Sequence, residues 1–442
     1  MAARPLSAWR ASVHPTARSL AAALRIPRTG FVMECKRASP TEGVIRQAYD
    51  PVVVAREYVP FADAISVLTD EPFFQGSLEH LRAVREAVDL PVLCKDFVVD
   101  PYQVYEAREA GADAILLMLS VLDDEAYATC SAAAADAGIE TLTEAHTGDE
   151  LARAVLLGAP VIGINNRDLA TLRVDLDTMR RLAPLVPADR VVIGESGIRS
   201  HADTRSLGAL VDGLLVGTTL MRSGDPAHAT RALVFGLTKV CGLTRPDDAR
   251  SAWASGATHG GLIFAAESPR AVDEELAERV RASAPLRWVG VFVNESPARI
   301  AAMAHRLRLA AVQLHGEETA ADVVALRPLL PSGCEVWKAL RVRGNIPPVS
   351  STGADRLLLD RWHPHVRGGT GESFDWSLLD GHGEKHRLIL SGGLTPESVP
   401  AAESLGVAGL DVNSGVEEAP GIKSPGRMAA FLAARRGAGR EH

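Results

Sequence analysis

The sequence is poor in cysteine and in aromatic residues. Its 442 residues include 5% aromatic side chains and five cysteines, which are odd in number, scattered and without CxxC spacing: Cys35, Cys94, Cys130, Cys241 and Cys334. This pattern excludes a disulfide framework and offers no zinc motif. Thiols that stay unpaired are typical of a reducing compartment. We therefore expect a cytoplasmic protein without a bound metal.

Long apolar runs and an excess of basic residues are also missing. No window approaches the ~18 uninterrupted apolar residues of a membrane span. The formal net charge of −8 argues against a general nucleic-acid surface, which needs a basic excess. A hydrophobic fraction of 47% is ordinary for globular domains. We expect a soluble enzyme with neither a membrane nor a nucleic acid as partner.

The first 33 residues contain no acidic residue, a composition that resembles an organellar transit peptide. The first predicted strand, however, begins near Phe31, so removal of a presequence would leave almost nothing before it. We favour the interpretation of SLAAALR, residues 19–25, as a short helix that packs against the protein.

Short apolar runs that end in polar or glycine residues alternate with alanine-rich helical stretches, which is typical of βα units around a parallel barrel. Eight such runs lie between residues 31 and 218, and eight more lie between residues 239 and 415. A (βα)8 barrel needs roughly 200 to 250 residues, so the chain is long enough for two. We predict an α/β protein of two fused (βα)8 TIM barrels, with domains at residues 1–236 and 237–442.

A glycine-containing cassette occurs twice, as VVIGESGIRS with VDGLLVGTTLM and as LILSGGLTPES with AGLDVNSGVE. Gly197 and Gly213 are 16 positions apart, as are Gly393 and Gly409. Glycines let the backbone approach an anion, and the amides of a following helix start donate hydrogen bonds to it. Strands seven and eight of a TIM barrel build such a phosphate site. Each barrel is therefore predicted to bind a phosphorylated small molecule.

Polar residues end the apolar runs of the first half, where the active site of this fold lies. Glu34 and Lys36 are two apart and point to the same side of one strand. We expect them to meet the other strand-end residues at one mouth: Lys95, Glu144, Asn165 and Glu195. Lysines and carboxylates crowded around a phosphate suit acid/base chemistry on an anionic sugar phosphate.

The second half has a cysteine, Cys241, at the end of its first strand, and an aspartate, Asp360, at the end of LLLD. A thiol acts as a base only where positive or dipolar surroundings lower its pKa. A base and an acid on different strands suit a proton shuttle. His363 and His365 have no ligand cluster nearby, so we interpret them as residues of a solvated loop.

The first half resembles indole-3-glycerol phosphate synthase through the motifs ECKRASPTEGVI, VLCKDFVVDPYQVYEAREAGADAILLM, TLTEAHTGDEL, GINNRDL and GESGI. The resemblance implies that Lys95 is the general acid at the sugar carbonyl and Glu144 the acid/base for dehydration. Glu34, Lys36 and Asn165 would stabilise intermediates. It further implies a carboxylate contact at Arg167, a ring contact at Phe97, for which a barrel-top core role is an equal alternative, and phosphate contacts at Ser196, Gly197, Gly217 and Thr218.

The second half is similar to phosphoribosylanthranilate isomerase through KVCGLT, FAAESPR, VQLHG, LLLD with GGTGESFDW, LSGGLTPESV and GLDVNSGVE. The resemblance implies an Amadori rearrangement with Cys241 as general base and Asp360 as general acid. Arg270 would bind the anthranilate carboxylate and Asp411 would support the site. Gly392, Gly393, Ser414 and Gly415 would hold the phosphate. Gln313 and His315 are either substrate contacts or a satisfied polar pair.

We therefore predict a bifunctional, monomeric enzyme of tryptophan biosynthesis that needs no cofactor. Its second half makes the substrate of its first half. One alternative is an aldose-ketose isomerase of the histidine pathway, which shares the phosphate cassettes but has an aspartate at the end of strand one. Another is a phosphosugar-binding protein with one inactive barrel, which the complete residue sets disfavour.

Overall fold

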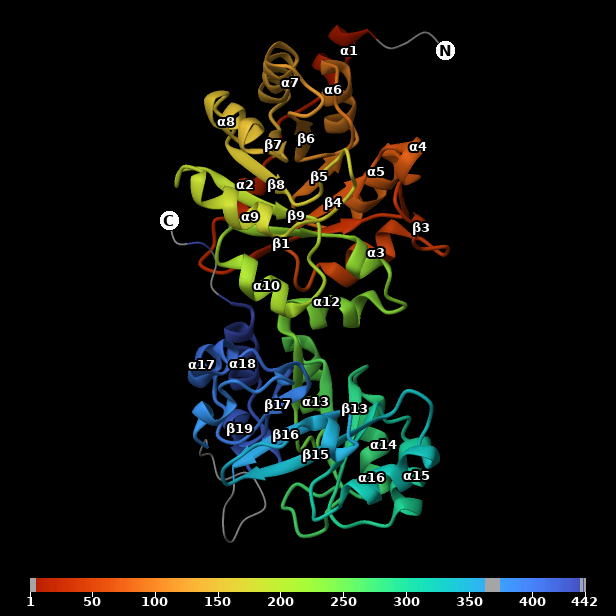
Figure 1. The fold of residues 1–442 in the computed structure, drawn as a ribbon. Helices are drawn as coiled ribbons and strands as arrows, with labels where there is room; N and C mark the ends of the chain where they lie inside the picture. Colours follow the sequence, from red (N-terminus) through yellow and green to blue (C-terminus); the bar gives the residue numbers. More distant parts are fainter. Residues whose placement is uncertain (1–4, 362–373, 438–439, 441–442) are drawn as a thin grey trace. The chain divides into compact units, whose positions relative to one another are not determined.

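The computed structural model describes residues 5–361, 374–437 and 440. The chain forms two compact units, one of Met1–Val234 with Gly437–His442 and one of Phe235–Arg436. Each unit is a closed barrel of eight parallel strands (Figure 1). The predicted fold class of two (βα)8 barrels is thus confirmed, whereas the boundary between residues 236 and 237 stays a prediction.

The first barrel uses all eight apolar runs predicted for it. In the order of the chain its strands are β1 (Gly30–Cys35), β4 (Ala64–Leu68), β5 (Val92–Lys95), β6 (Ala114–Met118), β7 (Glu140–Ala145), β8 (Val161–Asn165), β9 (Val191–Glu195) and β10 (Gly213–Val216). Sequential strands are neighbours, and β10 pairs with β1 to close the barrel. Nearly every strand residue is buried, which explains why the strands appear as continuous apolar runs.

Helices follow the strands, and most of them start at a side chain that caps the first turn. They are α3 (Pro51–Tyr58), α5 (Leu78–Ala87), α6 (Pro101–Glu109), α7 (Asp124–Ala137), α8 (Gly148–Leu156), α9 (Asp177–Leu182), α10 (His201–Gly208), α11 (Thr218–Met221) and α12 (Pro226–Phe235), with α4 (Glu71–Phe74) as an extra turn. In α6, for example, Asp100 accepts from Tyr102 N, and Pro101 occupies the first turn.

Two helices precede the first strand, α1 (Leu6–Ser12) and α2 (Leu20–Leu24). The side chains of Leu20 and Leu24 are fully buried and belong to the cluster inside the barrel. A Cβ at Gly213 would lie 2.9 Å from Leu24, so the missing side chain there leaves the space that the leucine fills. The predicted packing helix is confirmed.

The second barrel also contains its eight predicted strands. They are β11 (Leu237–Val240), β12 (His259–Ile263), β13 (Arg287–Phe292), β14 (Ala311–Leu314), β15 (Glu335–Val342), β16 (Arg356–Arg361), β17 (Leu388–Leu390) and β18 (Gly409–Val412). Helices α13 (Pro246–Ser255), α14 (Glu274–Ala282), α15 (Pro297–Arg306), α16 (Ala320–Leu326), α17 (Val399–Ser404) and α18 (Pro425–Arg435) surround them. Trp337 is fully buried in the inner cluster with Val289, Leu358 and Ile389.

Each barrel also has a short two-stranded sheet outside its eight strands. In the first barrel β2 (Ala38–Ser39) pairs with β3 (Gly43–Val44), and in the second β19 (Glu417–Ala419) pairs with β20 (Ile422–Lys423). Short 3-10 turns, among them η6 (Pro396–Ser398) and η7 (Ser414–Val416), follow the last two strands of the second barrel. Among the described helices none is long and apolar enough to cross a membrane.

Candidate active sites

The first barrel has a cavity of about 320 Å³ at the carboxyl ends of its strands. All but one of the residues predicted for this site line it: Glu34, Lys36, Lys95, Phe97, Glu144, Asn165, Arg167, Ser196, Gly197, Gly217 and Thr218. The exception is Glu195, which is fully buried and does not reach the cavity surface. Parallel strands thus bring together residues that are far apart in the chain.

Four charged side chains form a connected cluster at the floor of this cavity. Glu34 contacts Lys36 Nζ through Oε1 at 2.7 Å and Lys95 Nζ through Oε2 at 3.4 Å. Lys95 Nζ donates to Glu195 Oε2 at 2.8 Å. Burial alone would raise the pKa of Glu34, but Lys36 and Lys95 outweigh it and lower that pKa to about 2. Glu34 is therefore a permanent anion between two ammonium groups.

Lys95 lies among carboxylates from three strands. Burial disfavours its charged form, but Glu195, Glu34 and Glu144 together raise the pKa of Lys95 well above its ordinary value. Lys95 therefore enters any reaction as an ammonium ion with a proton to donate.

Glu195 lies beneath Lys95 rather than at the mouth, where we expected all the strand-end carboxylates. Burial raises the pKa of Glu195 to about 8, and the nearby Glu144 adds to this effect although Lys95 opposes it. Gly163 has no side chain, and a Cβ there would overlap Glu195 Oε1. Glu195 is therefore fixed in a position from which it orients the Lys95 ammonium group.

Glu144 has a partner that the sequence analysis missed. His146 Nε2 is 3.1 Å from Glu144 Oε1, at ion-pair distance but without the alignment of a good hydrogen bond. On its other side, His146 Nδ1 is 3.1 Å from Glu150 Oε2. Burial would raise the pKa of Glu144, but His146 and Lys95 hold it below its ordinary value. The two-residue spacing in Glu144-Ala145-His146 was the signal, since alternate residues share one side of a strand.

The predicted phosphate residues of the first barrel have the backbone that such a site needs. Ser196 and Gly197 both have positive φ angles, 65° and 85°, so the chain turns sharply after β9. A non-glycine residue in this region is strained, which is common at ligand sites. A Cβ at Gly217 would overlap Glu34 Oε1, and Thr218 begins α11 directly after it. The loops after β9 and β10 thus bring the predicted phosphate residues to the wall of the cavity.

Arg167 and Phe97 lie on the cavity wall. Arg167 Nη1 donates to Leu172 O at 3.0 Å, which holds the guanidinium group in its loop. The Phe97 ring is 37% exposed and packs edge-on against Phe73, with centroids 6.3 Å apart. An aromatic surface and a cation therefore both face the space above the charged cluster.

The second barrel has a cavity of about 600 Å³ at the corresponding end. All the residues predicted for this site line it: Cys241, Arg270, Gln313, His315, Asp360, Gly392, Gly393, Asp411, Ser414 and Gly415. Of the GGTGESFDW motif, residues 368–373 lie outside the described part of the chain, as do His363 and His365.

The surroundings of Cys241 contain a buried lysine that the sequence analysis also missed. Lys239 is fully buried, and its Nζ donates to Asp411 Oδ1 at 2.9 Å. A Cβ at Gly261 would lie 2.8 Å from Cys241 Sγ and 2.9 Å from Lys239 Cε, so both side chains occupy the space over that glycine. Burial raises the pKa of the Cys241 thiol, and Lys239 is the main group that opposes this rise. Lys239 is therefore the positive charge next to the thiol, but burial still leaves the pKa of Cys241 above its ordinary value rather than below it.

His315 connects two other candidates. Its Nδ1 is 2.9 Å from Gln313 Nε2, and its Nε2 is 3.6 Å from Asp360 Oδ2. The polar pair of Gln313 and His315 is therefore formed within the protein, at the edge of the cavity and next to the predicted acid.

The second phosphate cassette repeats the geometry of the first. Gly392 and Gly393 have positive φ angles of 81° and 68°. A Cβ at Gly415 would overlap the carbonyl oxygen of Leu394, so the loop after β18 approaches the loop after β17 as closely as backbone allows. Within the described residues, no group of three or more metal-binding side chains is present in either barrel.

Comparisons with known proteins match both halves of the chain. The sequence model of the indole-3-glycerol phosphate synthase family matches residues 2–233, and that of the N-(5'-phosphoribosyl)anthranilate isomerase family matches residues 238–434. The tryptophan biosynthesis protein TrpCF of Yersinia pestis is 48% identical over 98% of this chain and 90% of its own length. The chain belongs to the TrpCF family.

Other TrpCF proteins show the same extent of similarity. That of Vibrio cholerae is 48% identical over 97% of this chain and 90% of its own length, and that of Salmonella typhi is 46% identical over 97% and 94%. The identity extends across both barrels, so the chain carries an indole-3-glycerol phosphate synthase domain followed by a phosphoribosylanthranilate isomerase domain.

Proposed function

We propose that the two barrels catalyse consecutive steps of tryptophan biosynthesis. The second barrel isomerises N-(5-phosphoribosyl)anthranilate to 1-(2-carboxyphenylamino)-1-deoxyribulose 5-phosphate. The first barrel converts that product to indole-3-glycerol phosphate with loss of carbon dioxide and water. The observation that carries this proposal is the presence, in one chain of the TrpCF family, of two phosphate cassettes under two different sets of acid/base groups.

In the second barrel, Asp360 protonates the ring oxygen of the ribose, which opens to a Schiff base. Cys241 then removes the proton from C2, and the resulting enolamine takes up a proton at C1 and loses its C2 hydroxyl proton to give the ketone. Lys239 supports this role because its charge stabilises the thiolate. Arg270 binds the anthranilate carboxylate, while Gly392, Gly393, Ser414 and Gly415 hold the phosphate.

In the first barrel, Lys95 protonates the carbonyl oxygen while the aromatic carbon that bears the carboxylate attacks the carbonyl carbon. Carbon dioxide then leaves, and Glu144 assists the loss of water. The surroundings of Lys95 support the acid role, because three carboxylates keep its ammonium group charged. Glu34, Lys36 and Asn165 stabilise the intermediates. Glu195 holds Lys95 in place at 2.8 Å.

Further contacts place the substrate of the first barrel. Arg167 meets the carboxylate that leaves, Phe97 packs against the aromatic ring, and Ser196, Gly197, Gly217 and Thr218 hold the phosphate. None of these steps needs a cofactor. Both substrates are phosphorylated small molecules, and we expect a monomeric protein of the cytoplasm.

The comparisons do not favour the histidine-pathway isomerase or the binding protein with one inactive barrel. The direct test supplies the purified chain with each substrate separately. We expect consumption of N-(5-phosphoribosyl)anthranilate and, in a second assay, formation of indole-3-glycerol phosphate from the deoxyribulose phosphate. A chain that performs only one of these conversions would support the binding-protein alternative for the other barrel.

A further inference from the structure

Arg270, the residue proposed to bind the substrate carboxylate, is held by a carboxylate of the protein. Its Nε donates to Glu417 Oε1 at 2.9 Å and its Nη2 donates to Glu417 Oε2 at 2.7 Å. Two parallel bonds of this kind fix the plane of a guanidinium group. Among the described residues, no hydrogen bond of Arg270 Nη1 to the protein is present, and Arg270 lines the cavity. The edge of the guanidinium group formed by Nε and Nη2 therefore binds Glu417, and the edge with Nη1 is available to a ligand.

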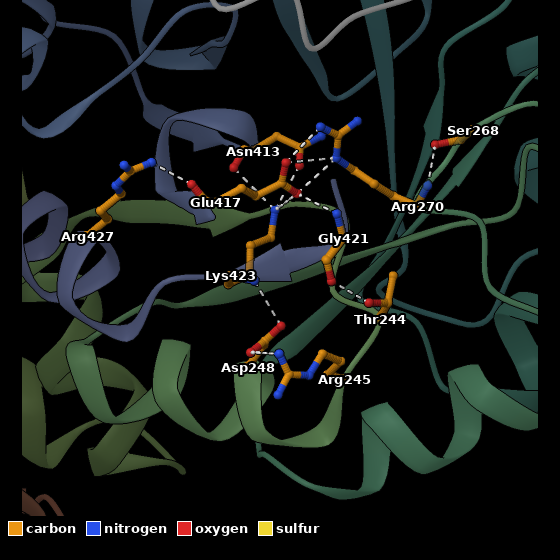
Figure 2. A network of polar contacts seen from close by, with 10 residues as sticks. All are labelled: Thr244, Arg245, Asp248, Ser268, Arg270, Asn413, Glu417, Gly421, Lys423 and Arg427. Atoms are coloured by element: carbon orange, nitrogen blue, oxygen red, sulfur yellow. Dashed lines mark hydrogen bonds and ion pairs between the residues drawn. The ribbon is translucent and has the colours of Figure 1, made fainter. Parts of the chain in front are cut away.

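Glu417 is in turn held by the short hairpin of β19 and β20. Figure 2 shows Lys423 reaching back along this hairpin, where its Nζ contacts Glu417 Oε1 at 2.8 Å. The backbone N of Gly421 donates to the same oxygen at 3.2 Å. Burial alone would raise the pKa of Glu417, but Arg270 and Lys423 together hold it below its ordinary value. The carboxylate is therefore ionised at neutral pH.

Lys423 also reaches the loop that holds the phosphate. Its Nζ donates to Asn413 Oδ1 at 2.8 Å and to Asn413 O at 3.2 Å, directly before Ser414 and Gly415 (Figure 2). The Lys423 side chain is fully buried, and its backbone N donates to Asp248 Oδ2 at 3.0 Å. Glu417 and Lys423 thus link the Arg270 guanidinium group to the loop that is proposed to hold the phosphate.

Arg270 and Asn413 also meet over Gly242, where the absence of a side chain leaves room for both. A Cβ at Gly242 would lie 2.7 Å from Arg270 Cδ and 2.9 Å from Asn413 Oδ1. Gly242 follows Cys241, so Arg270 and Asn413 both pack over the backbone next to the predicted base. The guanidinium group and the start of the phosphate loop are therefore held close to the backbone of the predicted base.

We propose that Glu417 and Lys423 are positioning residues that set the spacing between Arg270 and the phosphate loop, so that the second barrel selects substrates with a carboxylate at one end and a phosphate at the other. This inference rests on the proposed isomerase function. It assigns a role in specificity to the hairpin of residues 417–423, which lies outside the eight strands of the barrel.

An electrostatic role and an orienting role of Glu417 predict opposite effects of its substitution on substrate binding. The cluster holds two cations, Arg270 and Lys423, and one anion, Glu417. If net charge alone attracted the substrate, Glu417→Gln would strengthen binding, because it removes the negative charge. If Glu417 orients the guanidinium group, the same substitution weakens binding, since a neutral amide accepts only one of the two hydrogen bonds from Arg270.

The test measures KM and kcat for N-(5-phosphoribosyl)anthranilate in Glu417→Gln, Lys423→Met and a control, Glu275→Gln. Glu275 forms an exposed ion pair with Arg279 on α14, so its loss should change neither constant. We expect KM to rise ~10-fold in Glu417→Gln with kcat within ~3-fold of the wild type, as for loss of uniform binding. An unchanged or lower KM overturns the proposal.

A second comparison separates positioning from a general loss of structure. In an Arg270→Met background, Glu417→Gln should add less than ~2-fold to KM, because residues that act through one another are not additive. If Glu417→Gln raises KM by the same factor in the Arg270→Met background as in the wild type, the proposal is overturned. The phosphorylated product analogue without the carboxylate, 1-phenylamino-1-deoxyribulose 5-phosphate, should inhibit the wild type and Glu417→Gln within ~2-fold of each other. If the wild type does not isomerise the substrate at all, the proposed function fails rather than this inference.

Discussion

The buried ion pair of Lys239 and Asp411 gives the sharpest prediction for the second barrel. Lys239 has no exposed surface, and its Nζ is 2.9 Å from Asp411 Oδ1. Substitution Lys239→Met keeps most of the side-chain volume but leaves the Asp411 carboxylate buried without its cation. It also removes the positive charge next to Cys241. Both the free energy of unfolding of the second barrel and its isomerase activity should therefore decrease.

The magnitude follows from the burial of the pair. Removal of one partner from a buried ion pair costs about 3–5 kcal/mol in the free energy of unfolding. For a domain of this size, this corresponds to a fall in Tm of ~6–20 °C. Loss of an adjacent opposite charge also reduces the thiolate fraction of a cysteine ~10- to 1000-fold, and kcat/KM for the isomerase should fall within that range.

Tryptophan fluorescence isolates the unfolding of the second barrel, because all of the six tryptophans except Trp9 lie in the second half of the chain. Lys385→Met is the matched control, since the Lys385 side chain is half-exposed and forms no ion pair among the described residues. The double variant Lys239→Met with Asp411→Leu should regain most of the stability but not the activity. A loss of less than ~1 kcal/mol in Lys239→Met would refute the reasoning, because that is the size expected of an exposed pair.

Two further predictions concern the first barrel. The Glu34 carboxyl, with a pKa of about 2 against an ordinary 4.5, contributes ~3 kcal/mol of stability that is complete above pH 4.5 and is lost as the pH falls toward 2. The difference in unfolding free energy between wild type and Glu34→Gln should therefore shrink over that pH window, and a constant difference would contradict the assignment. Gly217→Ala should lower the synthase kcat ~10-fold, because its Cβ displaces Glu34 at a cost of about 1–3 kcal/mol. A Cβ at Gly224 meets no atom within 4 Å, so the control variant Gly224→Ala should keep the synthase kcat of the wild type. The isomerase activity should be normal in both variants.

The architecture was predictable because it depends on short-range patterns. Each strand is a buried apolar run, and several runs end at or next to a polar residue that lines the cavity, so the sequence was enough to predict the strands and to bring Glu34, Lys95 and Cys241 to the mouths of their barrels. The glycine spacing shared by the two halves indicated, for the same reason, the two loops that we propose hold phosphate. Backbone conformation in these segments follows from local sequence.

The partners of the proposed catalytic groups were not predictable in the same way. Glu195 ends its strand as Glu144 nearly does, but only the packing at Gly163 places it beneath Lys95 and away from the cavity. Lys239 looked like an ordinary strand residue, although it is the buried cation next to Cys241. Such pairs depend on contacts between strands that are far apart in the chain, which single-strand patterns do not contain.

The hairpin of Glu417 and Lys423 is the least visible part of the site in the sequence. It follows the last strand of the barrel, where a parallel-barrel pattern predicts only a final helix. Its importance becomes clear from the bonds of Glu417 to Arg270, a residue that lies 147 positions earlier in the chain.

The most direct test of the two-site account is complementation between Lys95→Ala and Cys241→Ala. Supplied with N-(5-phosphoribosyl)anthranilate, Lys95→Ala alone should accumulate the carboxyphenylamino-deoxyribulose phosphate, and Cys241→Ala alone should leave the substrate unconsumed. An equimolar mixture of the two variants should form indole-3-glycerol phosphate. Consumption of the substrate by Cys241→Ala, no deoxyribulose phosphate from Lys95→Ala, or no indole product from the mixture would contradict the claim that each barrel carries its own complete active site.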